Sequence, residues 1–354
     1  MTSPAVLPRL GEGGDRALRF TLSPTPLDAL PEVTWVGLVR GPAGPLLFHS
    51  LFRTVPPNPV PGNVVLSTPL AGGPSSPVAI DHGMVPVSLR WDAAMRPDGR
   101  FAVVFEHALG ATNAVFLRSP DDLPPLEPSE FLGRAPSPEA QARVNARLVQ
   151  GAISPPRSFD SFTDPRFVRG ADRSLAITAV VDGRQLALFS AVQSPSREPP
   201  PWRRVEVACV DGIVVANEGG TGLVYKTLAS GRADEDEIVT GRLHYVRLQP
   251  DLRPAGPPVD VFPNLDVFGI DAAPLADGVA VLATTRTGLA AAVVSTGARG
   301  PLLLGLAEHP MEDRVTSPSI LADASRVHVA AIASRRSPKA RVITGTLEVT
   351  RTAP

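Results

Sequence analysis

The strongest fold signal in the chain is Trp91-Asp-Ala-Ala-Met-Arg-Pro-Asp-Gly-Arg-Phe-Ala-Val-Val-Phe105. An apolar run stops at a short turn that contains Asp98 and Gly99, and a second apolar run follows at once, which is the pattern of a β-hairpin. The pattern returns at intervals of roughly 40 to 75 residues, which predicts a radial array of small sheets. Its other centres are Gly170-Ala171-Asp172, Asp211-Gly212, Asp277-Gly278 and Asp323-Ala324.

Each repeat unit contains three successive strands, and the segment that leads to the next unit supplies a fourth. After Asp277-Gly278, for example, two apolar runs (279–283 and 289–294) are separated by a turn at Thr287-Gly288. Their continuous apolar character is typical of strands that are covered on both faces. Four-stranded antiparallel units in series are the blades of a β-propeller. We therefore predict an all-β fold with a single β-propeller domain over residues 1–354, with six blades and seven as the alternative.

The two ends of the chain are expected to meet in one blade. The apolar run 17–21 near the N-terminus can pair with the last predicted strand, 341–349, which closes the ring and removes exposed sheet edges. A looser unit over residues 34–48 supplies a further blade. Apolar runs within residues 60–90 either complete that blade or form a seventh.

One segment has helical rather than strand character. Ser137 is a suitable N-cap, Pro138 fits the first helical position and Gly151 suits the left-handed stop. Within the predicted helix 137–151, Ala140, Val144 and Leu148 fall on one stripe. We place this helix in an insertion between two blades, residues 119–157.

Composition excludes several classes of function. The chain has 34 basic and 35 acidic residues, a formal net charge of −1, which predicts neither nucleic-acid nor membrane-surface binding. Its single cysteine, Cys209, lies in an apolar run and is expected to be a buried hydrophobe. The N-terminus lacks the pattern of a secretory signal, and no apolar run reaches the roughly 18 residues that a membrane span needs. We expect a cytoplasmic protein without membrane insertion.

Two stretches resemble a known repeat. Met95-Arg-Pro-Asp-Gly99-Arg-Phe-Ala-Val-Val-Phe105 and Asp164-Pro-Arg-Phe167 are similar to the repeat of TolB-like, WD40-like (PD40-type) propellers. In that repeat a proline and an aromatic residue open the innermost strand, and a Ser-Pro-Asp-Gly turn leads to an apolar strand. Here Arg96 replaces the usual serine, and no unit carries the whole signature. The resemblance implies a propeller and leaves the activity open, because this fold serves many functions.

In the register of that repeat, Asp92, Asp164 and Asp271 occupy matching positions just before the innermost strands. They would then surround the mouth of the central channel. Converging carboxylates there could bind a divalent cation or cleave a glycoside, and the alternative is that each caps its own turn. No catalytic residue and no cofactor are otherwise predicted. The Gly219-Gly-Thr-Gly222 segment is interpreted as a hairpin turn rather than a phosphate loop, because no helix follows it.

Two features are candidates for a protein-binding surface. One is the helix 137–151 with Val144 and Leu148, and the other is an acidic loop formed by Asp234, Glu235, Asp236 and Glu237. Because no catalytic motif is recognisable, we favour a non-enzymatic function. The leading hypothesis is a scaffold for protein–protein interaction in a bacterial assembly. The alternatives are a metal-dependent or glycoside-cleaving hydrolase that uses the channel-mouth carboxylates, and a carbohydrate-binding module, which would have a shallow pocket beside an exposed tryptophan in several blades.

Overall fold

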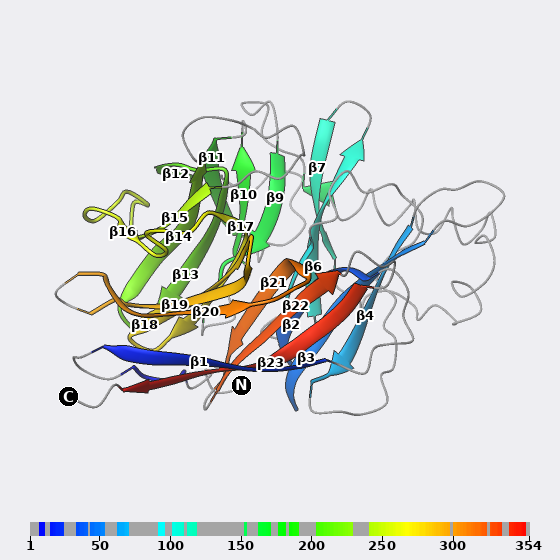
Figure 1. Cartoon of the computed structure of the whole chain (residues 1–354). Helices are drawn as coiled ribbons and strands as arrows, with labels where there is room; N and C mark the ends of the chain where they lie inside the picture. Colours follow the sequence, from blue (N-terminus) through cyan, green and yellow to red (C-terminus); the bar gives the residue numbers. More distant parts are fainter. Residues whose placement is uncertain are drawn as a thin grey trace.

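The protein is described by a computed structural model that is all-β and contains no helix in its described part (Figure 1). The described residues are 7–10, 15–24, 33–41, 43–53, 62–70, 91–95, 101–109, 112–118, 152–153, 162–170, 176–181, 184–190, 203–228, 241–297, 300–323, 326–334 and 340–351. Within these ranges no helix exists that could span a membrane.

The strands form antiparallel units of three or four, in sequence order. The first unit is β2 (Val33–Gly41), β3 (Gly44–Arg53) and β4 (Gly62–Pro69). The second is β5 (Trp91–Met95), β6 (Phe101–Leu109), β7 (Thr112–Arg118) and β8 (Ala152–Ile153), and the third is β9 (Phe162–Phe167), β10 (Ala176–Val181), β11 (Gln185–Ser190) and β12 (Arg203–Ala208). The fourth is β13 (Asp211–Asn217), β14 (Gly220–Leu228), β15 (Gly241–Leu248) and β16 (Val259–Asp260), and the fifth is β17 (Val267–Leu275), β18 (Gly278–Thr285), β19 (Gly288–Ser295) and β20 (Leu302–Pro310). The last contains β21 (Arg314–Ala322), β22 (Val327–Ser334), β23 (Ala340–Arg351) and β1 (Arg16–Pro24).

The first strands of these units contact one another in a ring: β2 with β5, β5 with β9, β9 with β13, β13 with β17, β17 with β21, and β21 with β2. The fourth and fifth units share one ladder pair, Gly241 with Val267, and are otherwise separate sheets. This arrangement confirms the predicted propeller of antiparallel sheets. Residues 71–90, on which the seven-blade alternative depends, lie outside the described residues, and the number of blades stays a prediction.

The chain ends meet as expected. Strand β1 pairs with β23 over its full length, from Arg16 opposite Arg351 to Pro24 opposite Ile343. The N-terminal strand is therefore the outermost strand of the sheet that the C-terminal strands build (Figure 1). Pairing of this kind closes a ring of sheets without leaving a free edge at the junction.

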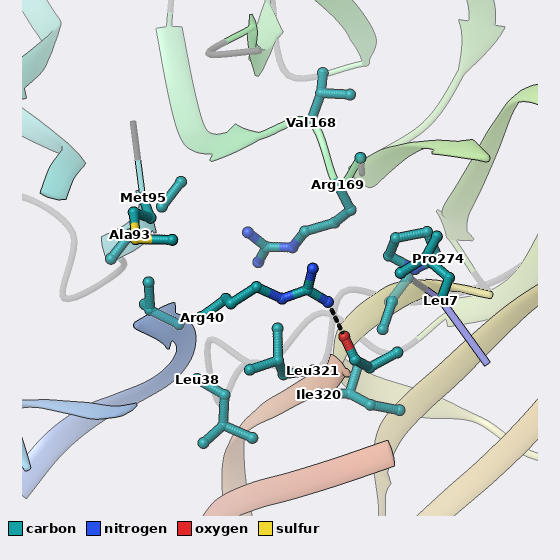
Figure 2. A pocket seen from close by; sticks show the side chains of 16 residues that line it. Leu7, Leu38, Arg40, Ala93, Met95, Val168, Arg169, Pro274, Ile320 and Leu321 are labelled. Atoms are coloured by element: carbon teal, nitrogen blue, oxygen red, sulfur yellow. Dashed lines mark hydrogen bonds between the residues drawn. The ribbon is translucent and has the colours of Figure 1, made fainter. Parts of the chain in front are cut away.

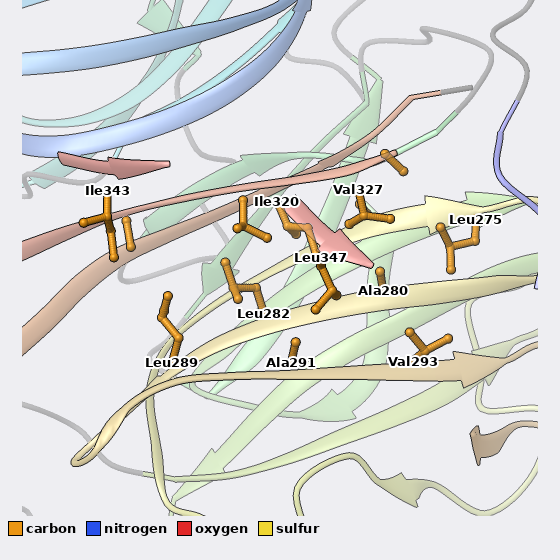
Figure 3. Close-up of a cluster of buried hydrophobic side chains, with 14 of the residues drawn as sticks. Leu275, Ala280, Leu282, Leu289, Ala291, Val293, Ile320, Val327, Ile343 and Leu347 are labelled. Carbon is orange, nitrogen blue, oxygen red and sulfur yellow. The ribbon is translucent and has the colours of Figure 1, made fainter. Parts of the chain in front are cut away.

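Apolar side chains fill the spaces between neighbouring sheets. The largest cluster lies between β17–β19 on one side and β21–β23 on the other, where Leu282, Leu289 and Val293 face Ile320 and Leu347 (Figure 3). Every residue of β18 is buried, which explains why its sequence is continuously apolar. Similar clusters fill the space between the third and fourth units and between the first and the last.

The predicted hairpins are correct with one exception. Asp277-Gly278 lies at the β17–β18 connection, and Gly219 precedes β14 at its connection with β13. The strands that flank three further predicted turns pair as expected, β5 with β6, β9 with β10 and β21 with β22, whereas Asp98-Gly99, Ala171-Asp172 and Ala324 lie outside the described residues. The Asp211-Gly212 prediction is wrong, because these residues begin β13, whereas the preceding strand β12 is the outer strand of the unit before. The same sequence pattern, two apolar runs separated by a turn, also occurs where the chain passes from one blade to the next.

The predicted insertion, residues 119–157, lies outside the described residues except for β8. Strand β8 pairs with β7 and so joins Ala152 and Ile153 to the second unit. The helix 137–151, with Val144 and Leu148, and the acidic loop from Asp234 to Glu237 also fall outside the described part.

Candidate functional site

A half-buried cation links the walls of the central channel. Arg169 lies two residues after the end of β9, and its guanidinium donates to both carboxylate oxygens of Asp92 on β5, at 2.9 Å each. It also donates to Asp271 on β17 at 3.1 Å. Asp92 and Asp271 are only 5% and 2% exposed. Bidentate pairing of this kind is a strong, directional interaction when water is excluded.

The same network continues around the ring. The backbone N–H of Phe167 on β9 donates to Asp92 at 2.7 Å, and the N–H of Ile320 on β21 donates to Asp271 at 2.9 Å. The Ser319 hydroxyl donates to Asp271 at 3.2 Å and accepts from the N–H of Leu38 on β2 at 2.8 Å.

The backbone of Arg169 also pairs with β13, since its N–H donates to Val214 and its carbonyl accepts from Ala216. The network of Asp92, Arg169, Asp271 and Ser319, which we call the channel network, therefore touches the first strand of every described unit.

In the channel network one cation, Arg169, is shared by two carboxylates, Asp92 and Asp271. Burial raises the pKa of the Asp92 carboxyl, and Arg169 opposes this effect. Burial by itself would lower the pKa of Arg169, but Asp92 and Asp271 together raise it above its ordinary value. Arg169 is therefore charged at every accessible pH, and both carboxylates have a permanent cationic partner.

The three carboxylates that the sequence placed together separate into two locations. Asp92 and Asp271 play the same role, because each accepts a backbone N–H from the first strand of the following unit. Asp164 lies at a different location. It lies in an irregularity of β9 between Thr163 and Arg166, three residues before Phe167, which Asp92 binds. A metal-binding or catalytic role for the three residues stays a prediction. Among the described residues no group of three or more metal-ligating side chains occurs.

The channel itself contains a small cavity of about 100 Å³. Figure 2 shows the Arg169 and Arg40 side chains entering it from opposite walls, with Leu38, Met95 and Leu321 around them. Arg40 donates to the carbonyl of Ala322. A cavity of this size is below the roughly 300 Å³ of typical ligand sites, and we interpret it as a packed channel centre.

A larger pocket of about 630 Å³ opens where the first strands begin, and we call it the mouth pocket. Its volume is within the range of small-molecule sites. Its walls come from the first, third, fifth and last units. They contain Trp35, Asp164–Arg166, Phe268–Ile270, Thr284–Arg286, Met311–Pro318 and Ser334.

Two walls of the mouth pocket are built from strand irregularities that carry backbone strain. In β9 and β21 one extra residue interrupts the register, and the interruption contains Asp164-Pro165 and Ser317-Pro318. Asp164 has φ 50° and Ser317 has φ 48°, a left-handed conformation that non-glycine residues adopt rarely. Such strain costs on the order of 1–3 kcal/mol per residue and is concentrated at functional sites. Both of these strained residues face the same pocket.

Polar side chains of the mouth pocket differ in how firmly they are held. Arg166 donates to the buried Asp211 of the next unit at 3.2 Å, and Asp313 accepts from Arg341 at 3.4 Å. Arg286 and Arg314 are exposed and form no ion pair with a described carboxylate. The lining thus offers three arginines and three carboxylates, Asp164, Glu312 and Asp313, together with hydroxyl groups.

One aromatic wall completes the mouth pocket. The Trp35 indole lies along β2 over Gly37, where a Cβ atom would be only 2.2 Å from the ring. Only glycine at position 37 leaves room for this orientation. Trp35 is half-buried at the edge of the pocket. A flat indole face beside hydroxyls, arginines and carboxylates is able to bind a hydroxylated ring by stacking and hydrogen bonds.

The arginines of both sites were not predicted from the sequence. Arg169 lies in a half-buried connection between Val168 and Gly170, and several other charged residues lie close to it in sequence. Its two carboxylate partners are 77 and 102 residues away in sequence, so their pairing could not be recognised.

Comparison with known proteins supports the fold and no more. No family model matches the chain, and no curated protein matches it. A protein of unknown function from Dyadobacter fermentans is 11% identical over 94% of this chain and 99% of its own, with a TM-score of 0.54. A subtype N11 neuraminidase-like protein of a flat-faced bat H18N11 isolate is 8% identical over 98% and 97%, with a TM-score of 0.52.

Trypanosoma rangeli sialidase is 8% identical over 95% of this chain and 60% of its own, with a TM-score of 0.49. At these identities the comparisons establish a β-propeller, which agrees with the ring of antiparallel sheets. They do not establish the TolB-like repeat, which stays a prediction.

Proposed function

We propose that the protein binds a carbohydrate in the mouth pocket. The single observation that carries the proposal is a ligand-sized pocket of about 630 Å³ in which Trp35, three arginines and three carboxylates converge. Sugars are bound by an aromatic face together with paired donors and acceptors, and this lining supplies all three. Because the positive and negative lining groups are equal in number, the site suits a hydroxylated ligand better than a simple ion. This is the carbohydrate-binding alternative from the sequence.

The strained residues support the same site. Asp164 and Ser317 retain a costly backbone conformation on two walls of one pocket, and their shared location favours a functional explanation. The bulges direct these two residues toward the pocket instead of leaving them in the regular ladder.

The proposal is tested by isothermal titration with glucose, glucuronic acid, N-acetylglucosamine and their short oligomers. At least one of these saccharides should bind. The double variant Arg286→Gln/Arg314→Gln should weaken the affinity for that saccharide about tenfold or more, since each charged hydrogen bond contributes about 1.5–3 kcal/mol. Both arginines are exposed, so the variants should fold. Trp35→Phe should reduce the affinity less than Trp35→Ala. Arg326→Gln, on the opposite face, is the control. Unchanged affinity in the double variant, or no binding by any saccharide, would contradict the proposal.

Glycoside hydrolysis in the same pocket has less support than carbohydrate binding. Two of the three predicted carboxylates, Asp92 and Asp271, are held by Arg169 rather than exposed to a substrate. A carboxylate with a permanent cationic partner is a poor general acid and a poor metal ligand. Asp164, Glu312 and Asp313 line the mouth pocket and are the carboxylates to test for glycoside cleavage.

The scaffold remains a second candidate, and one observation favours it. Leu302 and Leu306 on the outer strand β20 are 61% and 42% exposed, so this strand offers two large apolar side chains for contact with a partner. Affinity capture with the wild type and with Leu302→Ser/Leu306→Ser tests this idea. A protein captured by the wild type and lost in the variant supports it, and identical captured sets contradict it. A protein partner, a TolB-like repeat and a cytoplasmic location are further proposals of the sequence analysis.

A further inference from the structure

We propose that the outer strands of the fourth unit carry a hydrolytic site, in which Thr227, His244 and Asp260 cleave esters with short acyl groups. The three residues come from β14, β15 and β16, which pair side by side in one sheet (Figure 1). They are separate from the residues that line the mouth pocket and from the channel network. The inference therefore goes beyond carbohydrate binding.

Two hydrogen bonds join the three side chains in a row. His244 Nδ1 lies 2.6 Å from Asp260 Oδ1, and His244 Nε2 lies 3.1 Å from Thr227 Oγ1. Both distances are within the range expected between a nucleophile, its base and the group that orients the base. The same order of hydroxyl, imidazole and carboxylate forms the catalytic triads of unrelated hydrolases, which are recognised by geometry rather than by sequence position.

The carboxylate sets the direction of both hydrogen bonds. An ionised carboxylate only accepts, so Nδ1 of the neutral imidazole carries the proton that Asp260 binds. Nε2 is then the acceptor, and the Thr227 hydroxyl donates to it. The hydroxyl proton is therefore directed at a base, which is the arrangement that activates a weak nucleophile.

The strand register holds the three side chains on one face of the sheet. Tyr225 is opposite His244, and His244 is opposite Asp260. Thr227 shares this face because it lies two residues after Tyr225 on the same strand. The Tyr225 ring packs against the imidazole, with 5.2 Å between the ring centroids and 36° between the planes. Since Tyr225 is only 8% exposed, a buried wall fixes the imidazole in addition to its two hydrogen bonds.

The reacting groups are accessible to a substrate. The side chains of His244 and Asp260 are 19% and 61% exposed, and Thr227 is half-buried. The methyl group of Thr227 crowds a carbon that its hydroxyl attacks. This crowding favours a small acyl group such as acetyl over a long or branched one.

An oriented cation lies next to the nucleophile. Arg242 is opposite Thr227 in the β14–β15 ladder, so both side chains are on the same face. The Arg242 guanidinium donates to the carbonyl of Pro263 at 2.7 Å and lies 3.5 Å from Asp266. A guanidinium has five N–H groups, so these two partners orient it and leave further donors. Such donors stabilise the negative oxygen that forms when a carbonyl group is attacked.

The reaction needs water as its only co-reactant. Oγ1 of Thr227 attacks the ester carbonyl carbon while its proton passes to Nε2 of His244. The ester C–O bond then breaks, the leaving alcohol takes that proton, and the acyl group remains on Thr227. Water attacks this acyl group with His244 again as the base, which releases the carboxylic acid and restores the hydroxyl. Asp260 and Tyr225 position the imidazole and do not touch the substrate.

Hydrolysis of p-nitrophenyl acetate by the full chain tests the proposal. The wild type should show saturable hydrolysis, and Thr227→Val and His244→Gln should each lower kcat/KM about 100-fold or more. Thr227→Ser should remain active, because serine keeps the hydroxyl and lacks the crowding methyl group. Asp260→Asn should lower kcat about tenfold with little change of KM, because an amide N–H that faces Nδ1 places the imidazole proton on Nε2. Thr221→Val, on the same strand and face, is the matched control and should behave as the wild type.

The position of the acetyl group provides a second measurement. Mass spectrometry after an acid quench should find it on Thr227 rather than on the adjacent Lys226. Alkaline hydroxylamine removes an acetyl ester from threonine and leaves an acetyl amide on lysine, so it should remove this label. Circular dichroism verifies that each variant is folded.

Three results would overturn the proposal. The first is no hydrolysis above the rate in buffer, and the second is an equal rate in the wild type, Thr227→Val and His244→Gln. The third is an acetyl group that hydroxylamine does not remove. Saccharide titrations use a different pocket and different variants, so the failure of one proposal leaves the other unaffected.

Discussion

Replacing Arg169 by methionine should destabilise the protein more than any other single change in the channel. The substitution keeps the apolar stem of the side chain and removes its charge, which leaves Asp92 and Asp271 buried without their cation. Removal of one partner from a buried ion pair costs about 3–5 kcal/mol. Backbone donors remain at both carboxylates, from Phe167 and Ile320, so we expect the lower end, about 3 kcal/mol.

The rescue variant separates charge from packing. In Arg169→Met/Asp92→Asn/Asp271→Asn no charge remains at the site, while the amide oxygens still accept the backbone N–H groups. This triple variant should recover about 2 kcal/mol relative to Arg169→Met, because neutral amides are much cheaper to bury than carboxylates. Such non-additivity is the signature of directly coupled residues.

Urea unfolding followed by circular dichroism measures both effects, with Arg314→Met as the control. Arg314 is exposed, so that control should change the free energy of unfolding by less than about 0.5 kcal/mol. Lowering the pH should reduce the difference between Arg169→Met and the wild type, since protonation removes the uncompensated charge. A loss below about 1 kcal/mol in Arg169→Met, or a triple variant no more stable than the single one, would refute the argument.

Three further predictions concern other parts of the structure. Burial lowers the pKa of His49 to about 4, against 6.5 in the unfolded chain (6.5 − 4 = 2.5). Acidification through that interval should therefore remove about 3 kcal/mol of stability that is fully present above pH 6.5. Urea titrations of the wild type and of His49→Gln at several pH values measure this loss, and parallel pH profiles of the two proteins would disprove it. Burial raises the pKa of the Cys209 thiol to about 12, so a thiol reagent should label it only after unfolding; fast labelling of the folded protein would contradict this. Gly222→Ala should destabilise by about 1–3 kcal/mol, because the new Cβ would lie 2.1 Å from the Tyr245 hydroxyl oxygen and 2.6 Å from two of its ring carbons. The paired Tyr245→Phe background should relieve only part of the cost, because phenylalanine keeps both ring carbons, and a neutral Gly222→Ala would show that the contact is not tight.

The fold could be predicted from the sequence because its signal is local. Turns such as Asp277-Gly278 and Thr287-Gly288 are flanked by apolar runs within the same hairpin, so a short window contains both strands. The pairing of residues 17–21 with 341–349 was accessible because a closed ring needs a partner for each outer strand. The hairpin prediction at Asp211-Gly212 was wrong, because a local window cannot distinguish a hairpin from a connection between two blades.

The sites depend on information that a local window does not contain. Asp164 lies within a one-residue irregularity of β9, whereas Asp271 follows a similar irregularity of β17, and nothing in the repeat pattern reveals either one. The position of each carboxylate therefore depends on the local register of its strand.

The most direct test of the mouth pocket is a crystal structure after soaking with the saccharide that binds most tightly in titration. Carbohydrate binding in the mouth pocket predicts density for a sugar ring against the Trp35 indole, with oxygen atoms within hydrogen-bond distance of Arg286 or Arg314. An empty mouth pocket in crystals that hold the saccharide elsewhere on the protein would contradict it.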